Sequence, residues 1–197
     1  MTDKPLSRDD LQVLFGMDCG LPAIQRDLEL AARIGYYPEA HESRHRALNF
    51  AFRHAPTAVI TVTVMHLSEV LELQLERASL ALLGRSLWVG RGRDKRLVDP
   101  DFQRLYELRV ARVAHGIKLR AWGEAAIRDV KDAHGTVITF LLATLGKLRA
   151  LLDELKSAGL FRDCEGLTAT VTLSDPFTDE DLRHLIEAAN GLAGPAT

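Results

Sequence analysis

The segment from Val137 to Leu152 constrains the fold of this chain more than any other feature. It is apolar apart from four residues, Thr139, Thr144, Lys147 and Arg149. We expect it to lie in a helical region that starts near Ala121 and ends at Gly159. A helix that is apolar over so wide an arc is buried on several sides or lies at a subunit interface. The segment therefore predicts a mostly α fold in which other helices surround this one.

The composition is that of an ordinary soluble domain. The chain has 197 residues, of which 47% are apolar and 26% charged, so one domain with a terminal extension is expected. No signal peptide is expected at the polar N-terminus, and no apolar run reaches the roughly 18 residues of a membrane span. Two distant cysteines, Cys19 and Cys164, predict neither a disulfide framework nor a metal site. We therefore expect a cytoplasmic protein without membrane contact.

The first 55 residues are expected to form an N-terminal helical extension. Ser7 to Asp10 is typical of a helix cap with an acidic first turn. Glycines 16 and 20 are expected to end that short helix, and Pro22 to start a second one that stops at Gly35. A third helix is predicted from Glu39 to Ala55, interrupted by Pro56.

A long helix and a basic loop are expected next. Residues 57–64 are rich in β-branched side chains, but the stretch to Leu83 has strong helical propensity, which favours one helix entered through Pro56. The loop from Gly84 to Val98 holds a single acid, Asp94, and a set of candidate RNA-binding residues: Arg85, Trp88, Arg91, Arg93, Lys95 and Arg96. Guanidinium groups bind phosphates, and an exposed indole stacks on a base. The alternative is a polar surface loop whose Trp88 packs into the core.

The next helix carries the candidate catalytic residues. Asp99-Pro100-Asp101 is typical of a helix start, and Gly116 is expected to end the helix. Arg109, Arg112 and His115 follow one another along one flank. A histidine can relay protons near neutral pH, and arginines can bind a phosphate, so together they could cleave RNA without a metal. The alternative is a solvated basic flank of an amphipathic helix.

The stretch from Glu107 to Gly116 resembles the motif of the HEPN superfamily (higher eukaryotes and prokaryotes nucleotide-binding domains). Those domains have an Arg followed four to six residues later by a His, and here five residues separate Arg109 from His115. The resemblance implies an all-helical bundle, metal-independent cleavage of RNA, and a cleft built from two motif helices in a homodimer. It covers roughly Pro56 to Gly159. Val110 stands where the family usually has a polar residue, and Arg112 is a candidate to replace it.

Two other motifs overlap between residues 41 and 49. His41, Glu42 and His45 form an H-E-x-x-H pattern, which on a helix can bind zinc with the glutamate as general base. The polar context of the motif and the alanine at position 51 argue against a zinc hydrolase. Glu42 to Asn49 is similar to the phospho-acceptor box of one histidine-kinase class, with His45 as acceptor. No glycine-rich ATP-binding domain follows it, which leaves only a phosphotransfer role.

The C-terminal tail, residues 160–197, has a different pattern. Residues 167–173 alternate with period two and predict a short strand, and Asp179 to Asn190 predicts a capped helix. A single strand needs a partner, which a second copy of the chain could supply. Together with the apolar segment from Val137 to Leu152, the tail therefore predicts a homodimer.

The sequence as a whole predicts an up-and-down helical bundle similar to HEPN proteins at residues 56–159, with a strand-and-helix tail. The expected function is metal-independent endoribonuclease activity of a defence or toxin type, with no cofactor. Its expected partners are RNA, a second copy of the chain, and an antitoxin or defence-system protein. The alternative is a non-catalytic helical module that binds RNA or a protein.

Overall fold

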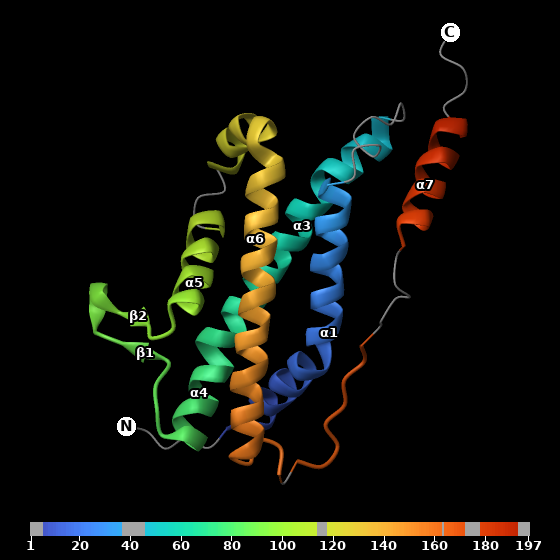
Figure 1. The fold of residues 1–197 in the computed structure, drawn as a ribbon. Helices are drawn as coiled ribbons and strands as arrows, with labels where there is room; N and C mark the ends of the chain where they lie inside the picture. Colours follow the sequence, from blue (N-terminus) through green and yellow to red (C-terminus); the bar gives the residue numbers. More distant parts are fainter. Residues whose placement is uncertain (1–5, 37–45, 114–117, 163, 172–177, 193–197) are drawn as a thin grey trace.

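The computed structural model describes residues 6–36, 46–113, 118–162, 164–171 and 178–192. Most of these residues are helical, which confirms the predicted mostly α class. There are three long helices, and α1 (Arg8–Tyr36) packs against both α3 (Arg46–Val70) and α6 (Lys118–Ser157). A shorter helix, α5 (Pro100–Val113), packs against α3 and α6 (Figure 1). The chain is thus a bundle with one long central helix.

Helix α3 continues without a break into three further helical segments. These are η1 (Leu71–Leu75), α4 (Glu76–Ala78) and η2 (Ser79–Leu83), of which η1 and η2 have π-helical hydrogen bonding. The helix ends at Gly84, whose left-handed φ of 64° a residue without Cβ adopts most easily. The structure therefore confirms a helix, and not a strand, over the β-branched residues 57–64.

The predicted breaks in the N-terminal part are wrong. Helix α1 runs continuously through Gly16, Gly20 and Pro22, where the sequence predicted two helices. A glycine inside a helix costs about 1 kcal/mol and a proline about 3 kcal/mol. Burial of the apolar face offsets this cost, because each fully buried leucine contributes about 1.5–3 kcal/mol. That face comprises Leu14, Met17, Leu21, Leu28 and Ala31. Figure 1 shows the N-terminal part of α1 inclined to the remainder, as expected where a proline removes a hydrogen bond.

The same correction applies to Pro56. Helix α3 passes through this position, although the sequence predicted an interruption there. Proline removes one backbone donor, and the helix beyond it is held by a buried apolar face. Ile60, Val64 and Leu67 on that face are almost fully buried. Tertiary packing again outweighs local propensity.

Helix α6 turns its apolar side chains into the bundle. Ile138, Leu141, Leu148 and Leu152 are between 0% and 2% exposed. The solvent face of the same segment is polar or small, with Thr139, Ala143, Gly146, Lys147, Arg149 and Ala150 exposed. The bundle itself therefore covers the apolar arc from which the sequence predicted a subunit interface.

The core is shared by all the long helices. Leu14 and Leu28 of α1 belong to the same buried cluster as Leu67 of α3, Leu105 of α5 and Leu148 of α6. The division of the chain at residues 55 and 159 stays a prediction. Within the described residues, helix α1 packs against α3 and α6 and contributes side chains to the shared core.

One helical stretch, Ala58–Leu83, is long and apolar enough to cross a membrane, by length and composition alone. Ile60, Leu67, Leu71 and Leu75 of this stretch lie at 0% exposure in the bundle core. A core helix of a soluble protein has the same composition. Burial in the core therefore accounts for part of this apolar character, while Val62, Met65, Leu73 and Leu80 of the same stretch are exposed.

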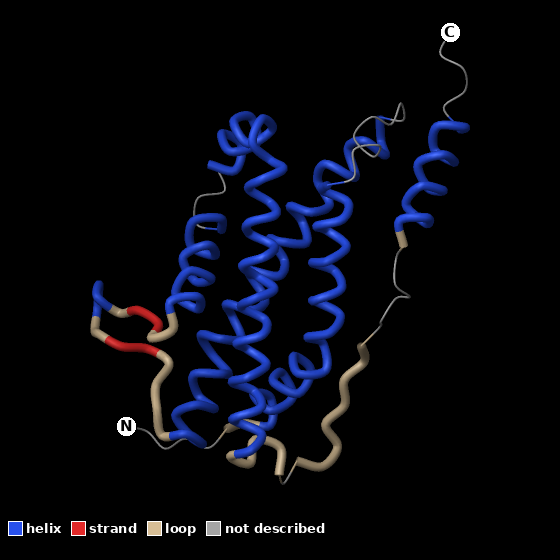
Figure 2. Tube along the Cα trace, viewed as in Figure 1, coloured by secondary structure: helices blue, strands red, loops and turns tan. Residues whose placement is uncertain are grey.

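The basic loop contains a small antiparallel hairpin that the sequence did not predict. Its strands are β1 (Trp88–Val89) and β2 (Arg96–Leu97), with Trp88 opposite Leu97 and Val89 opposite Arg96. Figure 2 shows the hairpin projecting from the side of the bundle beside α5. Its turn depends on Gly90, with φ of 80°, because a Cβ there would lie 2.3 Å from the backbone oxygen of Asp94. The basic loop from Gly84 to Val98 therefore forms an ordered projection, which we call the arm.

The predicted C-terminal strand is wrong for the residues that the structure describes. Residues 167–171 carry no strand pairing, and positions 172–173 lie outside the described residues. These described residues are held in part by Gln12 of α1, whose amide donates a hydrogen bond to the carbonyl oxygen of Thr168 at 2.6 Å. Helix α7 (Asp179–Leu192) follows, as predicted, with reciprocal hydrogen bonds between Thr178 and Asp181 at its start.

Candidate functional site

Arg109 lies on the inward side of α5, at its edge. It follows Phe102 and Leu105 at helical spacing, and both of those residues are buried. Its Nη1 donates a hydrogen bond to Oε2 of Glu72 in η1 at 2.7 Å, and each side chain is 33% exposed. The alternative to a catalytic role was a solvated basic flank. At Arg109 this flank is only partly solvated, because the guanidinium pairs with a carboxylate across the helix interface.

The remaining catalytic candidates cannot be placed. His115 lies outside the described residues, and Arg112 lies near the end of α5 with its side chain outside them. His41, Glu42 and His45 also lie outside the described residues. Among the residues that are described, no group of three or more His, Cys, Asp and Glu side chains could hold a metal ion. The structure thus leaves the Arg109–His115 pair as a prediction.

The basic hairpin concentrates positive charge on the described surface. Four of its predicted RNA-binding residues, Arg91, Arg93, Lys95 and Arg96, are exposed, against the single acid Asp94. The whole chain has a net charge of -2, so this excess of positive charge is local. A hollow of about 590 Å³ lies beside the arm, lined by Val89, Gly90, Arg93, Asp94, Lys95, Arg96 and Gln103. The arm can therefore present several cations to one anionic strand.

Trp88 packs inward at the base of the arm. Its ring lies edge-on to Tyr106 of α5, with the centroids 5.2 Å apart, and the Lys95 ammonium lies 4.4 Å from its centroid. The indole is only partly exposed and packs against the core. The predicted alternative in which Trp88 supports the fold therefore matches this packing, and base stacking on the ring would require Lys95 to move.

Arg85, the sixth predicted RNA-binding residue, is engaged within the bundle. Its guanidinium pairs with Glu154 of α6, although both side chains remain about half exposed. Its carbonyl oxygen accepts a hydrogen bond from the buried Ser79 hydroxyl at 2.7 Å. Glu76 accepts from the Ser86 hydroxyl and from the Leu87 backbone N–H, each at 2.7 Å. These contacts anchor the entry of the arm.

The exit of the arm is anchored by Asp99. Its carboxylate accepts hydrogen bonds from the backbone N–H groups of Asp101 and Phe102, which confirms the predicted helix cap. Lys147 of α6 reaches across to Asp99 at 2.9 Å and also pairs with Asp101. Hydrogen bonds to Asp101 and then to Asp99 raise the pKa of Lys147. The arm is therefore fixed to α6 at this end.

We expect Asp99→Ala to lower the free energy of unfolding by about 1 kcal/mol, as for other N-cap truncations. Burial is the largest single influence on Asp99 and raises its pKa. The hydrogen bonds from Lys147 and from the two backbone N–H groups outweigh it together, so the pKa is lowered. The carboxylate therefore contributes stability above its unfolded pKa of about 3.9, and this is lost as the pH falls through the lower folded pKa.

Thermal melting of the wild type, Asp99→Ala and Asp99→Asn at pH values from about 7 to 2 tests this cap. Asparagine can still accept the backbone hydrogen bonds, so it should lose only the ion pair with Lys147. The gap between the wild type and Asp99→Asn should close in acid. A gap that stays constant with pH would show that the charge of Asp99 contributes nothing.

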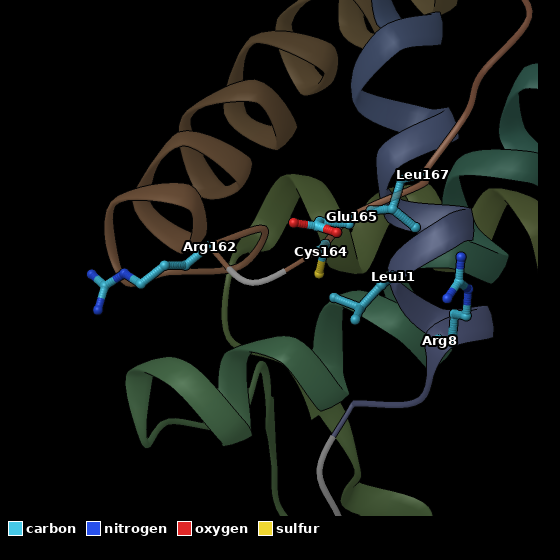
Figure 3. A pocket seen from close by; sticks show the side chains of 6 residues that line it. All are labelled: Arg8, Leu11, Arg162, Cys164, Glu165 and Leu167. Carbon is cyan, nitrogen blue, oxygen red and sulfur yellow. The ribbon is translucent and has the colours of Figure 1, made fainter.

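A second hollow, of about 600 Å³, lies near the start of α1 and the residues that follow α6. It is lined by Arg8, Leu11, Arg162, Cys164, Glu165 and Leu167. Figure 3 shows that Arg162 points away from Cys164 and Leu11, while Arg8 lies on the far side of Leu11. The charged groups do not converge on one point, so this hollow is a weaker candidate than the hairpin.

Three residues that organise the candidate site were missed from the sequence: Glu72, Glu76 and Lys147. Glu72 lies 37 positions from its partner Arg109, and Lys147 lies 48 positions from Asp99. No local pattern shows such pairs, because each depends on which helix faces lie together.

Comparison with known proteins gave no match: no family model, no curated protein and no solved structure matches the chain.

Proposed function

We propose that this protein binds single-stranded RNA on the basic hairpin and its flanking helix α5. The observation that carries the proposal is the exposed cluster of Arg91, Arg93, Lys95 and Arg96 on an arm anchored at both ends. Because the rest of the chain has a surplus of acidic residues, an anionic strand would be drawn to this arm. Phosphate contacts of this kind supply most of the affinity of non-specific binding.

Metal-independent cleavage of the bound RNA is the second candidate function. It rests on the resemblance of Arg109 and His115 to the HEPN motif and on the position of α5 directly after the arm. Arg109 lies about 14 Å along the helix axis from Pro100, at 1.5 Å per residue. A strand held by the arm can therefore extend toward Arg109. His115 would move the proton of the ribose 2′-hydroxyl or of the leaving oxygen, and Arg109 with Arg112 would stabilise the charge on phosphorus.

The biological setting belongs to the same proposal. A defence or toxin role in the cytoplasm, an antitoxin or defence-system partner and a HEPN-like homodimer all rest on the resemblance. The apolar side chains of α6 no longer support the dimer, because the bundle buries them. A non-catalytic module that binds a protein remains the alternative, and it requires no affinity for RNA.

Replacing Arg91, Arg93 and Arg96 together by glutamine should weaken the binding of single-stranded RNA by about 100-fold at 0.1 M salt. This figure follows from three lost phosphate contacts, each contributing about 0.7 to the log–log salt slope. Fluorescence anisotropy of a labelled RNA oligonucleotide, measured with a chelator present, gives the affinities.

The matched control replaces three exposed arginines elsewhere, Arg8, Arg149 and Arg162, by glutamine. It changes the net charge equally, so it should leave the affinity within a few-fold of the wild type. Equal losses in the two triple variants would show that overall charge, and not the arm, attracts RNA. No binding by the wild type to any single-stranded RNA would favour the protein-binding alternative.

A further inference from the structure

The ion pair between Arg109 and Glu72 joins two elements that are distant in the sequence. Nη1 of Arg109 lies 2.7 Å from Oε2 of Glu72, and a third of each side chain is exposed. This one hydrogen bond uses one of the five N–H donors of the guanidinium. Solvent therefore reaches the pair, and so can a solute anion.

Glu72 lies in a row of acids on the α3–α4 helix. Glu69 comes one turn before it and is exposed, and Glu76 comes one turn after it. Glu76 is already bound to Ser86 and Leu87 at the entry of the arm. Negative charge is thus concentrated along the helical segment that pairs with Arg109. In the free protein, these carboxylates compete with any phosphate that approaches Arg109.

A carboxylate and a phosphate bind a guanidinium through the same planar donors. Helix α5 carries Arg109 directly after the basic arm, so a strand held by the arm would bring its neighbouring phosphates toward this residue. Tethering raises the effective concentration of those phosphates far above that of a free anion. An exchange of ligands at Arg109 is therefore open to a bound strand and unfavourable for a free phosphate.

We propose that Glu72 is a resident competitor at Arg109, which a phosphodiester of arm-bound RNA displaces to complete the binding site. This inference rests on the proposed RNA binding by the hairpin. In the free protein, Glu72 occupies the Arg109 guanidinium and so blocks a binding position for phosphate. This competition lowers the affinity of the wild type for RNA. It is a positioning residue, because it acts through Arg109.

Glu72→Gln tests the proposal, with Glu69→Gln as the matched control. Glutamine can still accept a hydrogen bond from Arg109, so the fold should persist, as circular dichroism and thermal melting will show. Glu72→Gln should bind single-stranded RNA several-fold more tightly than Glu69→Gln. Its log–log salt slope should match that of the wild type, because the bound strand contacts Arg109 in both proteins.

The double variant Glu72→Gln/Arg109→Gln should have a slope shallower than that of the wild type by about 0.7, because the phosphate contact at Arg109 is then lost. Equal affinities for Glu72→Gln and Glu69→Gln, together with the wild-type slope in the double variant, would overturn the proposal and leave the pair a structural tie between α5 and η1. If that result comes with wild-type binding that still depends on the arm, RNA binding stands without the exchange. If neither the wild type nor Glu72→Gln binds RNA, both proposals fall.

Discussion

Replacing His115 by alanine should lower the rate of RNA cleavage by about 100- to 10,000-fold, the usual contribution of one general acid–base group. The proposed reaction has no other proton carrier assigned to it, so the 2′-hydroxyl or the leaving oxygen would lose its partner. Cleavage is followed on an end-labelled RNA in the presence of a chelator, which also excludes zinc chemistry at His41 and His45.

The control for this variant is RNA binding. His115→Ala should bind the oligonucleotide within a few-fold of the wild type, because the arm supplies most of the phosphate contacts. The combined loss of His115 and Arg109 should be no greater than the larger single loss, since the two act as one unit. Cleavage that persists unchanged in His115→Ala would leave RNA binding as the function of the motif helix.

The stability of the Arg109→Ala variant must be measured alongside its cleavage activity. The structure pairs its guanidinium with Glu72 at a half-buried position. Arg109→Ala would leave the carboxylate without this partner, whereas exposed substitutions away from such features typically stay within about 0.5 kcal/mol. A lower melting temperature for Arg109→Ala is therefore expected and does not by itself argue against catalysis. The catalytic role is therefore tested by RNA cleavage in the His115→Ala variant.

Leu148→Ala should lower the free energy of unfolding by about 2–5 kcal/mol, as large-to-small changes in a core do. Leu148 is at 0% exposure in the C-terminal half of α6, the helix that contacts both α1 and α5. The substitution removes three carbon atoms from a packed site and leaves a cavity. Urea unfolding followed by circular dichroism gives the change.

Leu73→Ala is the matched control. It removes the same atoms as Leu148→Ala, but from a side chain on η1 that is 40% exposed. It should cost well under half as much as Leu148→Ala. A loss of less than about 1 kcal/mol for Leu148→Ala would contradict the core described here, because buried leucines cost at least 2 kcal/mol in comparable series.

Much of the fold could be predicted from the sequence, because the bundle helices are marked by apolar periodicity and by caps. The Asp99 cap, the long helix through residues 57–83 and helix α7 were all predicted. Breaks at Gly16, Pro22 and Pro56 were wrong, since propensity is local and the burial that overrides it is not. The strand at residues 167–173 failed for a related reason: an alternating pattern favours an extended chain but cannot supply a partner edge.

The candidate site was less predictable than the fold. The excess of arginine and lysine in residues 85–96 identified the basic segment, because charge is visible in a sequence whatever the fold. The hairpin within it was missed, because each of its strands has only two residues and so shows no periodic pattern. The inward position of Arg109 and its pairing with Glu72 depend on how α5 packs against η1. Only the packed structure shows them.

The salt dependence of RNA binding tests the central claim, that the basic arm holds RNA phosphates, most directly. The logarithm of the binding constant is measured against the logarithm of salt concentration for the wild type and for the Arg91, Arg93 and Arg96 triple variant. Three lost contacts on a single strand should make the slope shallower by about 2. An identical slope for the two proteins would contradict the claim and leave the arm as a surface connection.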